Sequence, residues 1–339
     1  MVTGRDEPRV SVLLPARDAS ATLAACLRSL ARQSETRWEC ILVDDASRDD
    51  TRAIARTFAR GDPRFRIVAG PGRGIAPALQ AGLEHCRAPW VARMDADDWM
   101  HRERLAAQLD ALRQAPQLVG VGCHVRLFPR ARLTEGRRDY ERWLLSMRSE
   151  RDVRRDAFVE CPLAHPTWLL RRELLDRLGY RDCGFPEDYD LLLRILAAGH
   201  ELGVVPRRLL GWRDEPNRLS RRHPAYSDAA FTACKAEHLA TGLLADTAEY
   251  VLWGYGGTGR SLRRALAEHD RAPSHIVELH PGRLGQRIHG APVVGPDALP
   301  TLRGRKLIAS VAGAGPRGQI RHALARAGFD ELRDFVCAA

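Results

Sequence analysis

Lysine is almost absent from this sequence, and so are long apolar runs and paired cysteines. Only Lys235 and Lys306 are lysines among 53 basic residues, so nearly all the positive charge is arginine. No stretch approaches the roughly 18 apolar residues of a membrane span, and the N-terminus lacks an apolar signal core. The eight cysteines stand singly, without a CxxC pair or the spacing of a disulfide framework. We therefore expect a cytoplasmic protein that is not exported and does not cross a membrane by itself.

The composition is that of an ordinary globular protein with a basic surface. With 339 residues, 45% hydrophobic and 28% charged, the chain is long enough for two domains. Its formal net charge of +10 suits a plain solvated surface, or contact with nucleic acid, anionic headgroups or phosphorylated substrates. No stripe of interleaved aromatic residues accompanies the arginines, so we expect no nucleic-acid partner. The densest patches, 126–138 and 213–222, are candidates for peripheral contact at the inner face of a membrane.

Short apolar runs alternate with helical patterns in the first hundred residues. This rhythm predicts a mostly parallel sheet with helices on both faces. The predicted strands are 10–14, 40–43, 66–68 and 90–94. Because ligands bind beyond the carboxyl ends of such strands, we expect the residues that follow them to share one edge. Those residues are Pro15, Ala16, Arg17, Asp44, Asp45, Arg73, Asp95, Ala96 and Asp97.

Asp95 and Asp97 follow a predicted buried strand, and alternate carboxylates in that place can bind a divalent cation. Hard oxygen ligands suit Mg²⁺ or Mn²⁺, whose other ligands would be the oxygens of a diphosphate. The cation would neutralise charge that develops on a leaving diphosphate. A DxD sequence also occurs by chance in a helix cap or a solvated turn, but its position after 90–94 favours the metal site.

Two further strand ends offer contacts to a nucleotide. One carboxylate of Asp44 and Asp45 could accept the imino proton of a pyrimidine ring, and capping of the next helix is the competing role. Arg73 lies between Gly72 and Gly74, whose conformational freedom allows a tight turn close to a phosphate. An ordinary loop arginine is the alternative interpretation of Arg73.

An acidic cluster, Glu187, Asp188 and Asp190, opens an apolar-periodic helix predicted over 187–198. Acids favour helix N-termini for electrostatic reasons alone, so capping is a competing role. Three acids within four positions exceed what a cap needs. We expect one of them, preferably Asp188, to take the proton from an acceptor hydroxyl as that hydroxyl attacks a sugar.

Four segments in order resemble glycosyltransferase family 2, namely 12–15, 43–47, 94–98 and 187–190. The resemblance covers roughly residues 8–223. It implies a GT-A fold and an inverting single displacement from a metal-bound nucleoside diphosphate sugar, expected to be UDP-linked. It also implies an acceptor hydroxyl on a glycan or a lipid-linked acceptor in polysaccharide, glycolipid or glycan assembly.

The resemblance assigns Asp97 to the metal, Asp95 to the metal or the ribose, and Asp188 to the catalytic base. Together with the strand ends, the predicted nucleotide-sugar site comprises Pro15, Ala16, Arg17, Asp44, Asp45, Arg73, Asp95, Ala96 and Asp97. One departure from the family is Arg17-Asp18, which stands where relatives usually have a neutral residue and asparagine. The contacts to the nucleoside should differ accordingly.

Two further segments resemble the family at the acceptor and diphosphate sides. Segment 163–167 places His165 at the acceptor side, where Glu187 is a second candidate. A lone histidine is more often structural, so core packing is the alternative role of His165. Segment 219–223 resembles the stretch that closes over the diphosphate, where some relatives supply a histidine metal ligand, here His223.

A glycine-rich turn marks a second unit in the last third of the chain. Gly254, Gly256 and Gly259 follow the predicted strand 250–253 and open a helix, and Glu278 lies about 20 residues further on. Strand, glycines, helix and acid together are the context of a dinucleotide-binding fingerprint. They predict a smaller Rossmann-like α/β domain.

We therefore predict an α/β protein of two domains. The first, 1–246, is a GT-A type domain with a mixed, mostly parallel sheet and a helical connector at about 225–246. The second is 247–339, and its segment 288–293 resembles the nucleotide-sugar-binding domain of sugar acetyltransferases, and also C-terminal domains of some sugar methyltransferases, over roughly 249–336. It could bind NAD, bind a nucleotide sugar or serve only as a scaffold.

Two other classes of function remain open. With the C-terminal domain dominant, the chain would be an NAD-dependent or nucleotidyl-transferring sugar-nucleotide enzyme. With both domains binding and neither reacting, it would be a non-catalytic nucleotide-sugar sensor. Asp95, Asp97 and Asp188 favour glycosyl transfer, because hydride transfer needs none of them.

Overall fold

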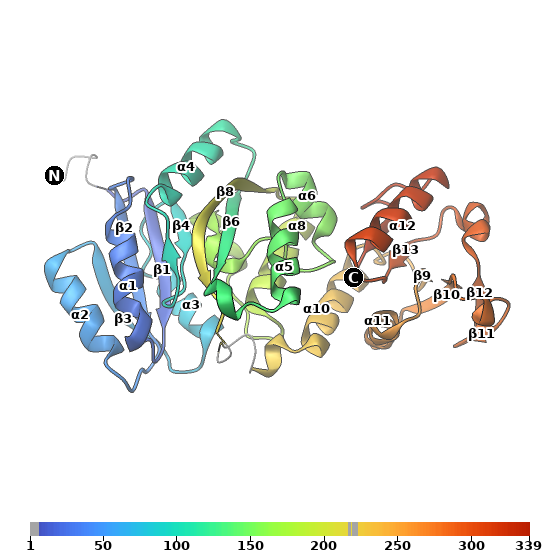
Figure 1. The fold of residues 1–339 in the computed structure, drawn as a ribbon, viewed down its shortest axis with the longest axis horizontal. Coiled ribbons are helices and arrows are strands. Elements are labelled where there is room, and N and C mark those ends of the chain that lie inside the picture. Colours follow the sequence, from blue (N-terminus) through green and yellow to red (C-terminus); the bar gives the residue numbers. More distant parts are fainter. Residues whose placement is uncertain (1–6, 216–217, 219–222) are drawn as a thin grey trace. The chain divides into compact units, whose positions relative to one another are not determined.

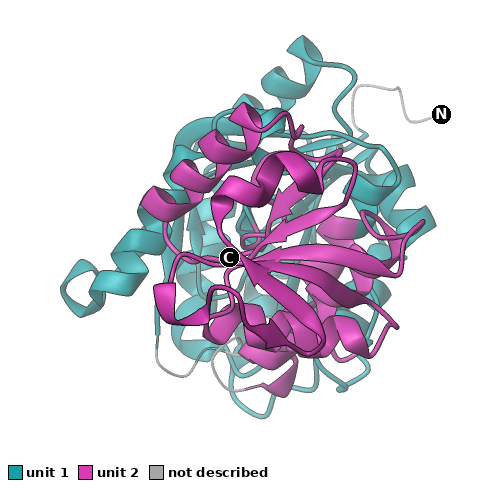
Figure 2. Cartoon of the chain, turned by 90° about the vertical axis from the view of Figure 1, so that its right-hand side faces the viewer, with its two compact units in different colours: residues 1–154, 162–183, 194–218 teal, residues 155–161, 184–193, 219–339 magenta. Residues whose placement is uncertain are grey.

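The computed structural model describes residues 7–215, 218 and 223–339. The chain forms two compact units, coloured separately in Figure 2. Unit 1 comprises Met1–Arg154, Pro162–Cys183 and Arg194–Arg218, and unit 2 comprises Arg155–Cys161, Gly184–Leu193 and Leu219–Ala339. This spatial division differs from the predicted boundary at residue 247. The predicted boundary separates two parts that should fold independently, and it stays a prediction. No helix in the described part of the chain is long and apolar enough to span a lipid bilayer.

Unit 1 is built on an eight-stranded sheet of order β3-β2-β1-β4-β7-β6-β8-β5. Its strands are β1 (Val10–Ala16), β2 (Trp38–Asp44), β3 (Phe65–Ala69), β4 (Trp90–Arg93), β5 (Trp99–Met100), β6 (Gly120–Phe128), β7 (Leu169–Arg171) and β8 (Leu202–Arg213). Strands β3, β2, β1 and β4 are mutually parallel, and so are β6 and β8. Strand β7 runs antiparallel to β4 and β6, and β5 runs antiparallel to β8. The predicted mixed, mostly parallel sheet is confirmed.

Helices flank this sheet, as Figure 1 shows. They are α1 (Ser20–Ala31), α2 (Thr51–Gly61), α3 (Ile75–Leu83), α4 (Arg104–Gln114), α5 (Glu135–Ser146) and α7 (Arg172–Leu178). The residues of α6 (Glu150–Asp156) and α8 (Glu187–Ala197) are divided between the two units. Helix α1 buries Leu23, Leu27 and Leu30, the residues at helical spacing, in the same core as the strand residues Val12 and Leu14. Burial of such a side chain stabilises the fold by roughly 1.5–3 kcal/mol, which fixes the face that α1 turns to the sheet.

Unit 2 has a six-stranded sheet of order β11-β12-β10-β9-β13-β14. Its elements are α10 (Asp228–Thr241), β9 (Glu249–Trp253), α11 (Gly257–Ala267), β10 (Ala272–Val277), β11 (Arg287–Ile288), β12 (Ala291–Val294), β13 (Leu307–Ala309), α12 (Ala314–Arg326) and β14 (Phe335–Cys337). Apart from the short β11, all of these strands are parallel. Numbered along the chain, the parallel strands have the order 3-2-1-4-5 of a doubly wound Rossmann-like sheet, as predicted.

The C-terminal sheet shares its core with segments from earlier in the chain. Leu239 of α10 and Leu244 pack in one cluster with Tyr250 and Leu252 of β9. Helix α10, expected as a connector, is therefore part of the hydrophobic core of unit 2.

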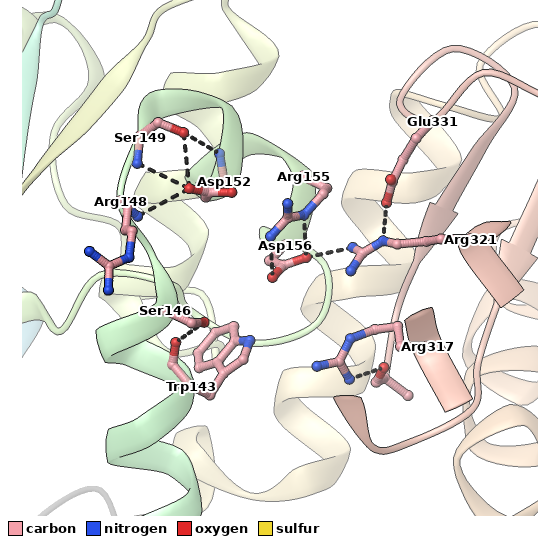
Figure 3. Close-up of polar contacts among 11 residues, drawn as sticks. Trp143, Ser146, Arg148, Ser149, Asp152, Arg155, Asp156, Arg317, Arg321 and Glu331 are labelled. Carbon is pink, nitrogen blue, oxygen red and sulfur yellow. Dashed lines mark hydrogen bonds and ion pairs between the residues drawn. The ribbon is translucent and has the colours of Figure 1, made fainter. Parts of the chain in front are cut away.

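A polar network also links an earlier segment to the C-terminal sheet. The carboxylate of Asp156, which is buried, accepts hydrogen bonds from Arg155 and Arg321, and Arg321 also pairs with Glu331 (Figure 3).

Candidate active site

The four parallel strands of unit 1 bring their carboxyl ends to one edge of the sheet. Strands β3, β2, β1 and β4 are neighbours in that order, and they end at Ala69, Asp44, Ala16 and Arg93. The segments that follow them therefore start side by side. The predicted nucleotide-sugar residues lie at the ends of these strands or on the segments that follow them, while the role of each residue stays a prediction.

Three carboxylates gather directly after β4. Asp95, Asp97 and Asp98 each offer one oxygen atom, and these atoms lie within 4.8 Å of one another. This spacing suits a divalent cation with hard oxygen ligands. Asp95 and Asp97 are predicted from the sequence and Asp98 is not, although its place beside Asp97 in the motif 94–98 was the available signal.

Two arginines offset the charge of Asp95. Arg93, the last residue of β4, forms an ion pair with Asp95, and Nη2 of Arg218 lies 3.8 Å from Oδ2 of Asp95. Burial opposes ionisation of Asp95, but the positive charges of Arg93 and Arg218 outweigh it, so the pKa of this carboxyl is lowered. Neither arginine was among the predicted site residues.

Asp97 and Asp98 are less well compensated. Burial raises the pKa of both carboxyls, and the negative charge of the neighbouring acids raises it further. Oδ1 of Asp98 accepts a hydrogen bond of 2.7 Å from the backbone N–H of Arg213, but Oδ2 is buried and has no hydrogen-bond partner among the described residues. A buried oxygen without a partner beside two other carboxylates fits a bound dication, which would supply the missing positive charge.

Asp44 organises the turn after β2. Its Oδ1 accepts a hydrogen bond of 3.2 Å from the N–H of Ser47, and its Oδ2 accepts one of 2.6 Å from Nε of Arg52. Burial opposes ionisation, but these hydrogen bonds and the charge of Arg52 lower the pKa of Asp44. The carboxylate is thus engaged within the protein, and its predicted contact to a nucleoside remains a prediction.

Asp45 fixes the loop that carries Arg73. Its two oxygens accept hydrogen bonds of 2.6 Å from the N–H of Gly72 and 3.0 Å from the N–H of Gly74, and Nη1 of Arg17 lies 3.7 Å from Oδ2. Gly72 and Gly74 have φ values of 71° and 108°, which glycine adopts at little cost. The structure therefore brings Arg17, Asp45 and the exposed Arg73 together through one carboxylate, a link that spacing in the sequence does not reveal.

His165 is buried against aromatic rings near the acid cluster. Its Nε2 lies 3.1 Å from the hydroxyl oxygen of Tyr180, and its ring packs against the rings of Trp168 and Tyr180. It also favours the ionised form of Asp95 electrostatically. His165 thus has the core packing that was its alternative role, and contact with an acceptor stays a prediction.

The acids that begin helix α8 differ in their surroundings within unit 2. Glu187 is buried and accepts a hydrogen bond from the hydroxyl of Tyr226. Asp190 is buried, and its Oδ1 lies 3.1 Å from Nε2 of His238. Asp188 is half-exposed, and its Oδ1 accepts a hydrogen bond of 2.8 Å from the N–H of Tyr189. Of the three acids, Asp188 is therefore the one with solvent access.

His223 belongs to unit 2 and is exposed. Its Nδ1 accepts a hydrogen bond of 3.3 Å from the N–H of Ala225, and its ring meets that of Tyr226 edge-on. Its role as a metal ligand stays a prediction. Residues 216–217 and 219–222 lie outside the described residues, so the second arginine patch and the segment before His223 are described only in part.

The glycine turn after β9 has the geometry that the fingerprint requires. Gly254 has a φ of 94°, and a Cβ atom there would lie 2.4 Å from Val311. A Cβ atom at Gly259 would lie 2.0 Å from the carbonyl oxygen of Gly254, so this glycine allows close helix–strand packing. A Cβ atom at Gly256 would meet nothing within 4 Å, which leaves that side of the turn open. Gly254, Gly256 and Gly259 thus have the geometry of the first, second and third glycines of the fingerprint.

Glu278 lies beside the same turn but is already engaged. Its Oε1 is 3.4 Å from the backbone nitrogen of Tyr255, and its Oε2 pairs with Nη1 of Arg283 at 2.8 Å. Arg283 also donates to the carbonyl oxygen of Tyr255. A ribose hydroxyl would have to compete with Arg283 for this carboxylate, and the ligand of this turn stays a prediction.

We expect Gly259→Ala to destabilise the chain by about 1–3 kcal/mol, because the new methyl group would overlap backbone and not a mobile side chain. Gly256→Ser is the matched control. The serine side chain would have open space, and serine is a favourable residue at this helix N-cap position. The free energy of unfolding should therefore change by no more than about 0.5 kcal/mol. Urea unfolding of the full chain measures both, and equal midpoints for the two variants would contradict the packing role of Gly259.

The chain is similar to known glycosyltransferases over most of its length. Residues 11–179 match the family model described as glycosyl transferase family 2. The amylovoran biosynthesis glycosyltransferase AmsE of Erwinia amylovora is 29% identical over 215 residues, which cover 63% of this chain and 78% of that relative. The uncharacterized glycosyltransferase EpsJ of Bacillus subtilis is 24% identical over 262 residues, covering 74% and 72% of the two chains.

Two solved structures have a similar fold. One is TarS of S. aureus, residues 1–349 with UDP-GlcNAc, with a TM-score of 0.55 and 14% identity over 77% of this chain and 71% of that one. The other is the mannosyltransferase PcManGT of Pyrobaculum calidifontis with GDP-Man and Mn²⁺, with a TM-score of 0.50 and 24% identity over 69% and 62%. The stretch 11–179 of this chain is therefore similar to glycosyl transferase family 2, and the sheet of unit 1 has the GT-A type fold.

Proposed function

We propose that this chain is an inverting glycosyltransferase that moves a sugar from a UDP-linked donor to a hydroxyl of a glycan or lipid-linked acceptor. The observation that carries the proposal is the cluster of Asp95, Asp97 and Asp98 at the carboxyl end of β4, in the stretch similar to family 2. Structures of similar fold contain UDP-GlcNAc, or GDP-Man with Mn²⁺. AmsE, the relative named above, takes part in amylovoran biosynthesis, which supports a role in polysaccharide assembly.

The residues that would hold the donor's metal are the three clustered aspartates. When bound, Mn²⁺ or Mg²⁺ would stabilise the negative charge that collects on the departing diphosphate. Arg93 and Arg218 lie beside Asp95 and keep it ionised, so that at least one ligand carries its charge at neutral pH. The loop held by Asp45 presents Arg73 at the same edge of the sheet, where a guanidinium could bind a phosphate oxygen.

Asp188 is the proposed base. Its carboxylate would take the proton of the acceptor hydroxyl while that oxygen bonds to the anomeric carbon and the bond from this carbon to the diphosphate oxygen breaks. A single displacement of this kind inverts the anomeric configuration. Glu187 and Asp190 are buried and hydrogen-bonded to Tyr226 and His238, whereas Asp188 is half-exposed, which supports Asp188 as the proton acceptor.

Binding by the C-terminal turn is a second candidate function. The open side of Gly256 lies at the end of β9, and β9 and β13 are the neighbouring strands at which the strand order reverses. Ligands of doubly wound sheets bind at such a switch point. The open turn supports binding of NAD or a nucleotide sugar. Such binding would be compatible with the proposed sugar transfer by unit 1.

The proposed function is tested with the full chain, a panel of UDP- and GDP-sugars and NAD, and Mn²⁺ or EDTA. A donor at 100 times its Kd should raise apparent stability by about 2.7 kcal/mol. We expect this stabilisation for one class of nucleotide sugar, dependent on Mn²⁺, together with slow release of the nucleoside diphosphate. Stabilisation without any release, even with candidate glycan acceptors, would favour a sensor, and stabilisation by NAD alone would favour the C-terminal site as the main function.

A further inference from the structure

A cavity of about 450 Å³ opens beside strand β8 in unit 1. The adjacent residues Cys123 and His124 of β6 pair with Val205 and Arg208 of β8, so residues 206–207 bulge out of the ladder. Such bulges bend a strand and redirect its side chains, and they are frequent beside functional sites. The cavity is lined by His101, His124, Leu145, Arg148, Pro206, Arg207, Arg208 and Leu209.

The wall of this cavity is basic, with three arginines, two histidines and no acid among its lining residues. Arg207 is paired with Glu103. The guanidinium groups of Arg148 and Arg208 make no hydrogen bond or ion pair with the residues that the structure describes. Figure 3 shows the guanidinium of Arg148 directed away from Asp152, which binds only the backbone N–H of Arg148. Two cations therefore face the cavity without a counterion from the described chain.

His124 adds a buried polar group to the same cavity. It is 7% exposed, and its Nε2 donates a hydrogen bond of 2.8 Å to the carbonyl oxygen of Met147. Burial lowers the pKa of His124, and the positive charges of Arg148 and Arg208 lower it further. The charges of both guanidinium groups thus reach the same buried imidazole, so Arg148 and Arg208 act on one small volume.

An anion in this cavity would neutralise both arginines. Guanidinium groups match the tetrahedral oxygens of a phosphoryl group and can each donate two parallel hydrogen bonds. The volume is in the range of small-molecule sites and exceeds that of a single phosphate group, which leaves room for an attached polar body. We propose that this cavity binds the phosphoryl group of a small phosphate ester, held by Arg148 and Arg208.

Calorimetry with sn-glycerol 3-phosphate and the full chain tests the proposal, with glycerol as the probe that lacks the phosphoryl group. We expect one glycerol 3-phosphate per chain and no binding of glycerol. Arg148→Gln and Arg208→Gln should each weaken binding about tenfold, because each removes a charged hydrogen-bond donor. Arg56→Gln, at an exposed position on α2, should leave affinity unchanged.

The same measurement in the Asp97→Asn chain separates this site from the proposed donor site, and affinity there should be unchanged. A sedimentation assay with phosphatidylglycerol and phosphatidylcholine vesicles identifies the source of the phosphoryl group. If the wild-type chain binds the anionic vesicles and the Arg148→Gln/Arg208→Gln double variant does not, the site binds a lipid headgroup. If the double variant sediments with the vesicles as the wild type does, the site binds a soluble ester. Failure of the wild-type chain to bind glycerol 3-phosphate, or equal affinity in the double variant, would overturn the proposal.

Discussion

Replacement of Asp97 by asparagine should reduce metal-dependent sugar transfer by a factor on the order of a thousand, since a metal ion contributes several kcal/mol of charge stabilisation. One carboxylate oxygen of Asp97 lies within 4.8 Å of an oxygen of Asp95 and of Asp98 after the end of β4. The substitution therefore removes one of three carboxylate ligands. The measurement is release of nucleoside diphosphate from the donor at saturating Mn²⁺. Manganese binding, followed by the paramagnetic signal of the free ion, should weaken in parallel.

The same variant should fold at least as well as the wild type in the absence of metal. Burial and the charge of Asp95 raise the pKa of Asp97, so the folded chain holds this proton more tightly than the unfolded chain. Because the pKa of Asp97 is raised on folding, its ionisation lowers the free energy of unfolding once the pH exceeds the pKa of an aspartate in the unfolded chain, about 3.9. Asparagine cannot ionise, so at neutral pH the variant should match or exceed the wild type without metal, and only the wild type should gain stability from Mn²⁺.

Asp110→Asn is the matched control, because Asp110 is an exposed acid of unit 1 that forms an ion pair with Arg113 on its own helix. It should change neither transfer nor metal affinity. Near wild-type turnover of Asp97→Asn with Mn²⁺ present would show that the clustered aspartates do not hold a catalytic metal.

Replacement of Asp188 by asparagine should slow transfer by a factor of about a hundred or more, while donor affinity changes little. The reason is that a base acts on the acceptor hydroxyl and contributes mainly in the transition state. Asp188 is half-exposed at the start of α8, so an amide of the same shape should be accommodated. Donor affinity is measured by calorimetry and transfer by single-turnover kinetics with a glycan acceptor.

The pH profile separates a base from a structural acid. The wild-type rate should fall at acidic pH as the base becomes protonated, and this limb should be lost in Asp188→Asn. Asp182→Asn, at an exposed acid six residues earlier in the sequence, should leave both rate and profile unchanged. A collapse of donor affinity in step with activity would instead assign Asp188 a role in binding or folding.

The main features of the fold were predictable from local pattern. Apolar runs that alternate with helical spacing predicted β1 to β4 and the helices between them, because burial on both faces of a parallel sheet requires continuous apolar strands. The glycine turn at 254–259 predicted a Rossmann-like unit, and the structure contains a steric demand at Gly254 and another at Gly259, while the side of the turn at Gly256 is open. The acids of 94–98 were visible because they follow directly on a strand.

The partners of those acids were not predictable in the same way. Arg218 is more than a hundred residues from Asp95 in sequence, and chain folding alone brings them to 3.8 Å. Arg93 lies in an otherwise apolar run on a buried strand, and its charge is accommodated because it pairs with Asp95. Asp45 was expected to bind ligand or cap a helix, but its oxygens fix the loop of Gly72 and Gly74.

Sequence alone therefore determined the class of fold and the sheet edge to which the strand-end residues come, because these depend on the periodicity of neighbouring residues. Tertiary structure decided which charges compensate one another, which acid keeps solvent access and which helix belongs to which core. Glu187, Asp188 and Asp190 are nearly equivalent along the chain, yet contacts with Tyr226 and His238 bury two and leave Asp188 half-exposed. Electrostatic and packing energies depend on distance in space, and a single sequence records only distance along the chain.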